Sequence, residues 1–316
     1  MKIELITPAA ANARNGNRGT AVRWARMLKQ LGHRLTLSQS YGGGRCDLMI
    51  ALHARRSFDS IRRFHESYPD LPLIVALTGT DLYRDIRNDA KAKRSLEIAT
   101  RLIVLQSMGL EELPRPLRPK TRVIYQSAPE VNGFIQPLGN RFRVCVVGHL
   151  RPEKDPMRTA MASRLLPASS RISVVHIGRA LTPELQKRIT YEAARNPRYR
   201  WLGDLPHWKT LKIMSGCHLL SITSRMEGSS NALSEAISLS VPVVASKIPG
   251  LMGTLGKDYP AYFPVGDTRE LAALLHKAES DKKFYLDLRS YCARLRPLVD
   301  PGRERASWKK VLDELS

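Results

Sequence analysis

The sequence is poor in acidic and aromatic residues. Of its 316 residues, 29 are Asp or Glu against 51 Lys or Arg, which gives a formal net charge of +22 at pH 7. A surplus of that size favours an anionic partner: nucleic acid, an acidic membrane or a phosphorylated small molecule. Because only 6% of the residues are aromatic and no RNA- or DNA-binding motif is present, we expect no nucleic-acid partner.

Cysteine and long apolar segments are also scarce. The four cysteines are far apart, and two of them, Cys145 and Cys217, lie in apolar runs. This spacing argues against a zinc knuckle and a secreted disulfide framework, and it favours small buried residues in a reducing compartment. The start, Met1–Pro8, is interrupted too soon for a signal peptide. No run approaches the ~18 apolar residues of a membrane span, so we expect a cytoplasmic protein without stable membrane association.

Short apolar runs alternate with segments of helical period in both halves of the chain. Leu73–Leu77 is apolar throughout, as expected of a strand in a parallel sheet covered on both faces. Helices are expected at Thr20–Leu31, Ser107–Leu113 and Pro156–Leu166, among others. At roughly 150 residues per domain, the pattern predicts an α/β protein with two doubly wound Rossmann-like domains facing a cleft. The expected parts are a first domain over residues 1–127, a linker over 128–140, a second domain over 141–303, and an amphipathic helix over 304–316 that packs back onto the first domain.

One strand-to-helix turn has the composition of a phosphate and ribose site. It follows the strand expected at Leu219–Ile222 and opens a helix that Ser229 or Ser230 can cap. The backbone N–H groups at such a helix N-terminus suit a phosphate. Glu235, about one turn into the helix, can accept hydrogen bonds from two neighbouring hydroxyls, and Glu227 precedes the helix. A single glutamate is usually an ordinary surface residue, but this pair at such a turn favours function.

This turn resembles the donor-site motif of GT-B glycosyltransferases, in particular the large retaining group that uses nucleotide sugars (family four). A second segment, Val147–Asp155, resembles the loop in which those enzymes grip the donor diphosphate through an arginine and a lysine. Lys154 matches the lysine, His149 stands in the arginine's place, and Arg151 is the candidate for the missing cation. The resemblance implies that the donor-binding residues are Gly148, His149, Arg151, Lys154, Ser229, Ser230, Asn231, Ala232 and Glu235, and that the catalytic residues are Glu227, Lys154 and Arg151.

The leaving group of such a reaction is a nucleoside diphosphate, whose charge must be balanced. Many transferases use a divalent metal held by an Asp-x-Asp pair, and the sequence has no convincing cluster of that kind. Lys154, Arg151 and the helix N-terminus can balance the charge instead. We therefore expect a metal-independent enzyme without a cofactor.

Three basic loops of the first half predict an anion-binding acceptor site. They follow the first, third and fourth expected strands, so they should meet at one edge of the sheet. Relatives that act on hydroxyls often carry a histidine after the fourth strand, where this sequence reads Thr-Gly-Thr-Asp and offers no such base. The candidate acceptor-binding residues are Asn17, Arg18, His53, Arg55, Arg56, Thr78, Thr80, Asp81 and Arg84.

These loops, together with Asn196–Gly203 and Tyr262–Thr268, resemble the selenosugar synthase family of selenoneine biosynthesis. The resemblance runs from about Asn15 to Trp308, and general GT-B enzymes lack its His-Ala-Arg-Arg-Ser and Thr-Gly-Thr-Asp-Leu-Tyr-Arg-Asp strings. It implies an enzyme that joins selenophosphate to the anomeric carbon of UDP-N-acetylglucosamine. UDP and phosphate would leave, and a carbon–selenium bond would form. The identity of the sugar comes from the resemblance alone, and the anomeric configuration and oligomeric state stay open.

Three other functions remain as alternatives. A GT-B transferase could add sugar to a lipid or polysaccharide at the inner membrane face, where positive charge meets anionic lipid. A basic nucleic-acid-binding protein is a second alternative, and a degenerate GT-B domain that only senses nucleotide sugar is a third. Under the selenosugar hypothesis, Glu235→Ala weakens donor binding and Arg55→Ala raises the KM for selenophosphate.

Overall fold

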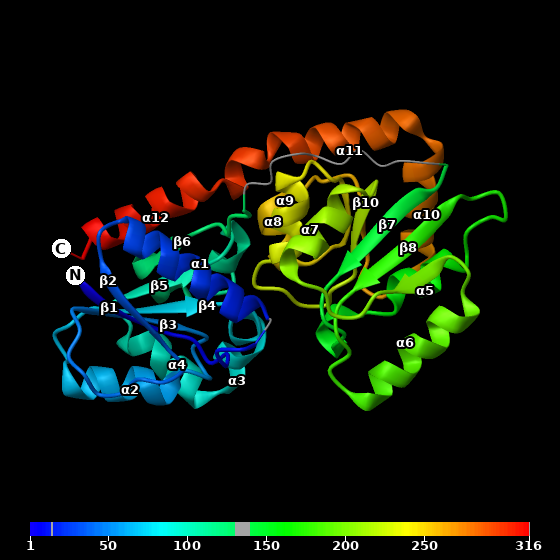
Figure 1. Cartoon of the computed structure of the whole chain (residues 1–316). Coiled ribbons are helices and arrows are strands. Elements are labelled where there is room, and N and C mark those ends of the chain that lie inside the picture. Colours follow the sequence, from blue (N-terminus) through cyan, green and yellow to red (C-terminus); the bar gives the residue numbers. More distant parts are fainter. Residues whose placement is uncertain (14, 130–139, 316) are drawn as a thin grey trace. The chain divides into compact units, whose positions relative to one another are not determined.

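The computed structural model describes residues 1–13, 15–129 and 140–315 (Figure 1). The predicted linker over 128–140 therefore falls mostly outside the described residues. Contacts divide the chain into two compact units. Unit 1 comprises Met1–Gln126, Glu227–Ser230 and Pro301–Ser316, and unit 2 comprises Ser127–Met226 and Asn231–Asp300.

Unit 1 is built on a six-stranded parallel sheet in the order β2-β1-β3-β4-β5-β6. β1, β3 and β4 are neighbours, with Ile3 opposite Leu48 and Met49 opposite Leu73. The strands are β1 (Lys2–Ile6), β2 (Arg34–Ser38), β3 (Leu48–Leu52), β4 (Leu73–Leu77), β5 (Arg101–Val104) and β6 (Thr121–Val123). The helices are α1 (Gly16–Gln30), α2 (Phe58–Ser67), α3 (Ile86–Asn88), α4 (Ala90–Ile98) and α12 (Pro301–Asp313), with a π-helical turn η1 (Asp81–Asp85).

Helices cover both faces of this sheet because its strands are apolar on both sides. In β3, Leu48 and Ile50 belong to a core that contains residues of α1 and α12. Met49 and Ala51, which alternate with them, belong to a second core with residues of α2 and α4. Side chains along a strand point alternately to opposite faces, so the continuous apolar run of β3 is what permits two helical layers.

The C-terminal helix α12 belongs to unit 1 and packs beside α1 (Figure 1). The Trp24 and Trp308 rings meet edge to face with centroids 4.8 Å apart, and both residues are fully buried. Glu304 is buried among them. Its Oε1 accepts a hydrogen bond from Nε1 of Trp24 at 2.6 Å, and its Oε2 accepts one from Nε of Arg23 at 2.9 Å. A charged acceptor thus satisfies a buried indole N–H while the rings supply the apolar contact.

Unit 2 is a second six-stranded parallel sheet, in the order β12-β11-β10-β7-β8-β9. Its strands are β7 (Phe142–Val147), β8 (Ile172–Ile177), β9 (Tyr199–Trp201), β10 (Leu219–Ile222), β11 (Val243–Ser246) and β12 (Tyr262–Phe263). Its helices are α5 (Arg158–Ser163), α6 (Pro183–Arg195), α7 (His207–Ser215), α8 (Asn231–Ser238), α9 (Pro249–Leu255), α10 (Thr268–Ser280) and α11 (Lys282–Arg294). The prediction of two Rossmann-like α/β domains is thereby confirmed.

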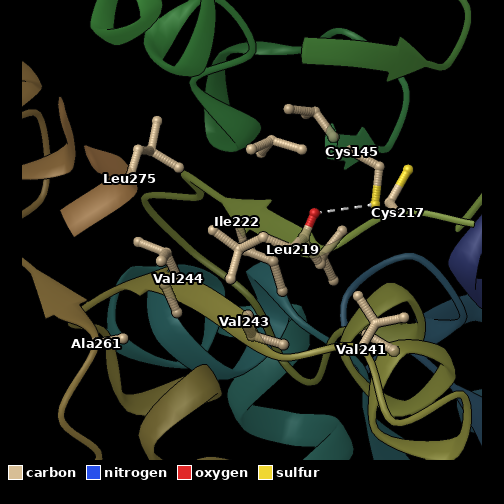
Figure 2. Packing of buried hydrophobic residues seen from close by; sticks show 14 of the residues in the cluster. Cys145, Cys217, Leu219, Ile222, Val241, Val243, Val244, Ala261 and Leu275 are labelled. Carbon is tan, nitrogen blue, oxygen red and sulfur yellow. Dashed lines mark hydrogen bonds between the residues drawn. The ribbon is translucent and has the colours of Figure 1, made fainter. Parts of the chain in front are cut away.

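Two cysteines lie in the core of unit 2, among residues of β10, β11 and α10 (Figure 2). Sγ of Cys145 donates to the carbonyl oxygen of Leu219 at 3.5 Å, and Sγ of Cys217 donates to that of Ile213 at 3.2 Å. A hydrogen bond with Cys217, together with complete burial, raises the pKa of Cys145. This thiol therefore stays neutral and acts as a small apolar residue, as the sequence predicted.

Some predicted helix bounds were wrong. α1 begins at Gly16 rather than at Thr20, because Oδ1 of Asn15 accepts from the Arg18 N–H at 3.0 Å and caps the helix. The helix expected at Ser107–Leu113 is only a short 3₁₀ turn, and α5 is shorter than predicted. α9 was missed because its two glycines weaken the helical pattern. None of the helices in residues 1–13, 15–129 and 140–315 has the length and apolar character needed to cross a membrane.

We expect Glu304→Ala to lower the free energy of unfolding by about 3 kcal/mol, because it leaves the buried Trp24 N–H and the Arg23 guanidinium without their acceptor. Urea denaturation followed by tryptophan fluorescence measures this change. Lys309→Ala is the matched control in the same helix. Lys309 is 65% exposed and pairs with an exposed aspartate, so its loss should cost less than about 0.5 kcal/mol. Equal midpoints for the two variants would contradict this account of α12.

Candidate functional site

In unit 2, the loops that follow β7 and β10 are bound to each other. These strands are neighbours, so both loops leave the same edge of the sheet. The hydroxyl of Thr223 lies 2.9 Å from the carbonyl oxygens of both Lys154 and Asp155. The backbone N–H of Arg225 donates to the carbonyl oxygen of Glu153 at 2.8 Å. These bonds fix the backbone around Lys154 independently of any ligand.

Gly148 and Lys154, two of the predicted donor-binding residues, lie side by side. A Cβ placed on Gly148 would be 3.8 Å from both Cδ and Cε of Lys154. Both residues line a cavity of about 20 Å³, together with residues of the β10 loop and with His176. A space of that size holds about one water molecule. The structure therefore brings the glycine and the lysine of the predicted diphosphate loop to one point.

Two histidines, one that lines this cavity and one in the β7 loop, make different contacts. Nδ1 of His149 accepts from the backbone N–H of Arg179 at 3.1 Å. Because an amide N–H only donates, Nδ1 of His149 presents its lone pair to the β8 loop. His176 is buried with its Nδ1 2.7 Å from the Tyr199 hydroxyl, and burial lowers its pKa to about 4. His176 is therefore uncharged at neutral pH. Arg151 is exposed, and its guanidinium has no partner among the described residues.

Gly178 supports the same loop, although the sequence analysis did not identify it. Its φ of +152° is one that residues with side chains rarely adopt. A Cβ there would be 1.9 Å from the carbonyl oxygen of Gly148 and 3.0 Å from the backbone nitrogen of His149. Only glycine allows the β7 and β8 loops to approach this closely. The glycine after β8 could have been noticed in the sequence, but the contact it permits is a tertiary feature.

The predicted phosphate and ribose turn opens α8. This helix begins at Asn231, so Ser230 occupies its N-cap position, and Asn231 and Ala232 form its first turn. Glu235 is 9% exposed, and its Oε1 lies 2.8 Å from Nε2 of His207, the first residue of α7. His207 was not among the predicted site residues, because 28 residues separate it from its partner. The mostly buried carboxylate of Glu235 thus has one oxygen in contact with the His207 imidazole.

The two other residues of that turn differ in exposure. Glu227 is buried, at 6% exposure, whereas Ser229 is half-buried. Both belong to the segment Glu227–Ser230 that clusters with unit 1, while Asn231 begins the part of α8 that clusters with unit 2. The predicted pair Glu227 and Glu235 is therefore divided between the two units.

In unit 1, the aspartate of the β4 loop shapes the backbone. Asp81 is completely buried. Its Oδ1 accepts from the backbone N–H groups of Thr78 at 3.0 Å and Gly79 at 2.8 Å. Its Oδ2 accepts from the N–H of Ala54 in the β3 loop at 3.0 Å. In the structure, the Asp81 carboxylate accepts from backbone donors and holds the two loops together. The contact of Asp81 with the acceptor stays a prediction.

The predicted histidine of the β3 loop is also buried. His53 is 3% exposed and has a φ of +71°. Its Nε2 lies 3.1 Å from Oγ1 of Thr80, and its Nδ1 accepts from the backbone N–H of Arg56 at 3.3 Å. The β4 loop therefore has a histidine beside it after all, contributed by the neighbouring strand. Sequence order concealed this contact, because 27 residues separate His53 from Thr80.

The predicted arginines of this edge are not equivalent. Nε of Arg55 lies 3.0 Å from Oδ2 of Asp89, and Nε of Arg84 lies 3.1 Å from Oδ1 of Asp85. Both guanidinium charges are thus partly balanced. Arg56 is exposed without a carboxylate partner among the described residues. The set includes two further residues in the first turn of α1, which are Asn17 and Arg18.

Two further observations bear on ligands. Within residues 1–13, 15–129 and 140–315, no group of three or more His, Cys, Asp or Glu side chains is arranged to hold a metal ion. A larger cavity of about 330 Å³ lies elsewhere in unit 2, lined by residues 163–164 and 195–198. Residues 195–198 of this lining immediately precede β9, which places the cavity toward the amino ends of the parallel strands. The loops of Lys154 and Thr223 follow the carboxyl ends, so this cavity is separate from them.

A comparison with protein families identifies the second half of the chain. Residues 132–294, slightly more than half of the sequence, match the family model described as glycosyl transferases group 1. The matched region contains the loops around Lys154 and Thr223 and the helix α8.

Solved structures resemble the whole chain. HepE of Anabaena, solved with UDP and glucose, is 16% identical with a TM-score of 0.76, and the match covers 100% of both chains. Sucrose-phosphate synthase of Thermosynechococcus elongatus is 14% identical with a TM-score of 0.80, over 99% of this chain and 98% of that one. The pneumococcal O-GlcNAc transferase GtfA, solved with UDP and GlcNAc, is 16% identical with a TM-score of 0.66, over 93% and 60%. At these identities the likeness establishes the fold, the two Rossmann-like units of GT-B proteins.

We expect Gly178→Ala to lower the free energy of unfolding by about 1–3 kcal/mol, because the added methyl group forces the Gly148 loop to move and strains the backbone. Urea denaturation of the whole chain measures the loss. Gly42→Ala is the control, since a Cβ at Gly42 would meet no atom within 4 Å. A change in Gly178→Ala no larger than that in Gly42→Ala would show that the two loops are not held as close as described.

Proposed function

We propose a function from the premise that this chain belongs to the glycosyl transferases of group 1: it transfers N-acetylglucosamine from its UDP derivative to selenophosphate. The observation that carries the donor half is the convergence of Gly148 and Lys154 at the β7 loop, which is bound to the β10 loop through Thr223. The acceptor half rests on the basic loops of unit 1 and on the sequence resemblance described above.

The donor site that we propose uses fixed charges and dipoles. Lys154 contacts the diphosphate, and Gly148 lets the backbone approach it. The side chain of His149 and the first backbone N–H groups of α8 contact the same diphosphate, with the helix dipole directed at its charge. Glu235 accepts from the ribose hydroxyls, with His207 holding one of its oxygens. HepE, which shares this fold, was solved with UDP-glucose, and this supports a UDP-sugar as donor.

The catalytic contribution that we propose is stabilisation of the leaving UDP. Negative charge grows on the diphosphate as its bond to the anomeric carbon breaks, and Lys154 stabilises that charge most where it is largest. The Arg151 side chain is exposed, so it must change conformation when the ligand binds in order to contact the diphosphate. Glu227 lies in the turn before α8 and contacts the sugar. We propose that the reaction uses neither a metal ion nor a cofactor.

The acceptor site that we propose is the edge where the β1, β3 and β4 loops of unit 1 meet. Arg56 carries a charge that no carboxylate among the described residues balances. Arg18 and Asn17 lie at the start of α1, after the adjoining strand. Arg55 and Arg84 contribute less, since Asp89 and Asp85 already bind them. Guanidinium groups suit the oxygens of a phosphate-type anion.

The chemistry balances with one water molecule. The selenium of selenophosphate attacks the anomeric carbon with its electron pair, and the carbon–oxygen bond to UDP breaks so that UDP leaves with that pair. The product of this step is a sugar whose anomeric carbon carries selenium bound to a phosphoryl group. Water then cleaves the phosphorus–selenium bond, which releases phosphate and leaves the 1-seleno-sugar. Selenium is a polarisable nucleophile that is already ionised, so the first step needs no base.

Mass spectrometry of the products tests the proposal directly. With UDP-N-acetylglucosamine and freshly prepared selenophosphate, we expect an ion with the selenium isotope pattern at the mass of the seleno-sugar, together with stoichiometric UDP and phosphate. Lys154→Met should reduce the rate at least about a hundredfold, because it removes the cation that balances the leaving group. Lys187→Met is the control, a lysine on α6 away from both loops. Formation of a glycolipid in the presence of liposomes, with selenophosphate unconsumed, would show instead that the acceptor is a lipid.

The two halves of the site predict opposite kinetic effects. Glu235→Gln should raise the KM for the UDP-sugar about tenfold and leave that for selenophosphate unchanged, whereas Arg56→Ala should do the reverse. Steady-state kinetics with each substrate varied in turn measures both. Glu270→Gln and Arg62→Ala, exposed residues on α10 and α2, are the matched controls. An Arg56→Ala enzyme with an unaltered selenophosphate KM would remove this edge from the acceptor site.

A further inference from the structure

We propose that Thr80 donates a hydrogen bond to an oxygen of an anionic acceptor, and that His53 positions this hydroxyl and does not act as a base. The inference rests on the proposed function, because it concerns how that reaction's acceptor is held. It starts from the contact of Nε2 of His53 with Oγ1 of Thr80, which are 3.1 Å apart.

The backbone determines which nitrogen of His53 carries the proton. The N–H of Arg56 lies 3.3 Å from Nδ1 of His53. An amide N–H can only donate, so Nδ1 must present its lone pair to it. A neutral imidazole with its lone pair on Nδ1 carries its proton on Nε2. His53 therefore donates to Thr80, and neither ring nitrogen is available to take a proton from a nucleophile.

The other groups that face His53 favour the same tautomer. Oδ2 of Asp81 lies 3.9 Å from Nδ1, beyond hydrogen-bond distance. Both oxygens of this carboxylate already accept from backbone N–H groups of the two loops. A proton on Nδ1 would face the Arg56 N–H and would lack an acceptor. Because His53 is 3% exposed, solvent does not supply an alternative partner.

This tautomer of His53 determines how the Thr80 hydroxyl is used. Its oxygen accepts from His53, so its own hydrogen must point elsewhere. Thr80 precedes η1 but makes no capping hydrogen bond with its side chain. No described protein group accepts the hydroxyl hydrogen, and the residue is partly exposed. The buried His53 imidazole thus occupies one lone pair of the Thr80 oxygen. The hydroxyl hydrogen of Thr80 is left to point away from His53, where a ligand can accept it.

Such a donor discriminates between classes of acceptor. A sugar hydroxyl must lose its proton to become a nucleophile, which calls for a base in the acceptor site. In this part of the proposed acceptor site, Thr80 and His53 provide a hydrogen-bond donor and do not provide a base. A phosphate-type oxyanion has no proton to lose and accepts such a hydrogen bond strongly. The pair therefore suits acceptors that are already ionised, which are the selenophosphate, thiophosphate and phosphate class.

The backbone of the β4 loop makes Thr80 the donor that counts. The N–H groups of Thr78 and Gly79 are bound by Asp81 and are not free for a ligand. Of the three consecutive residues that begin this loop, only Thr80 has a side-chain donor whose oxygen is already oriented by another residue. The neighbouring Arg56 adds charge from the β3 loop, and its own N–H fixes the His53 ring. Arg56 thus attracts the anion and, together with His53, orients the Thr80 hydroxyl that donates to it.

The variants follow from this geometry. Thr80→Val has nearly the same shape but lacks the hydroxyl, and Thr80→Ser restores it. His53→Asn suits the positive φ of this position, since asparagine tolerates such a backbone. Its Oδ1 can accept the Arg56 N–H in place of Nδ1, while it is too short to reach Thr80. This variant therefore keeps the loop and removes only the orienting hydrogen bond.

A binding experiment tests the inference without turnover. We expect calorimetric titration with inorganic thiophosphate to give an affinity about tenfold weaker for Thr80→Val than for the wild type, corresponding to one lost hydrogen bond to a charged group. Thr80→Ser should stay within about threefold of the wild type, and His53→Asn should be intermediate. Equal affinities for Thr80→Val and the wild type, or no thiophosphate binding by the wild type, would overturn the inference.

Kinetics with selenophosphate separates a donor from a base. We expect the same order of variants in the KM for selenophosphate, with the UDP-sugar KM unchanged and kcat within about fivefold of the wild type. If His53 were a base, His53→Asn would lower kcat by about a hundredfold or more without changing KM, and this result would overturn the inference. A wild type that binds thiophosphate through Thr80 but yields no seleno-sugar would refute the proposed function and leave this inference standing.

Discussion

Buried polar side chains that bind the backbone of a neighbouring loop determine the geometry of both candidate sites. In unit 1, the carboxylate of Asp81 collects N–H groups from the β3 and β4 loops. In unit 2, the hydroxyl of Thr223 lies against the carbonyl oxygens of Lys154 and Asp155. A loop that must satisfy such a group cannot move without leaving a buried charge or dipole unpaired, which is costly. The ligand-facing residues therefore start from a fixed backbone.

This arrangement gives polar residues two different roles. Asp81 and Thr223 shape the loops, whereas Lys154 and Arg56 are the cations that we propose contact the substrates. From sequence alone the two roles look alike, because both kinds of residue lie just after strands. Burial separates them: Asp81 is completely buried and accepts hydrogen bonds from backbone N–H groups, while Arg56 is exposed. A carboxylate that already accepts several backbone hydrogen bonds has less capacity left for a substrate.

The arginines that make the chain strongly basic also have more than one role. Many arginines serve the fold itself, as Arg23 does at Glu304, Arg164 at Glu192, and Arg122 at Glu314. Others, such as Arg198, donate to backbone carbonyls. Net charge therefore gives the sign of the preferred ligand but does not locate its site. The location depends on which cations the fold leaves without a carboxylate.

The sequence by itself determined the two Rossmann-like units, the strands and the loops that carry the donor and acceptor candidates. Apolar runs such as Leu73–Leu77 and the glycine and lysine after β7 are local signals, and a parallel sheet brings the ends of its neighbouring strands together. Only the tertiary structure decided the contacts that join those loops: His53 with Thr80, His207 with Glu235, and Gly178 with Gly148. Each pair is separated by more than 25 residues, so no local pattern reports it. Its existence depends on how two strands or helices pack, which is a property of the folded chain.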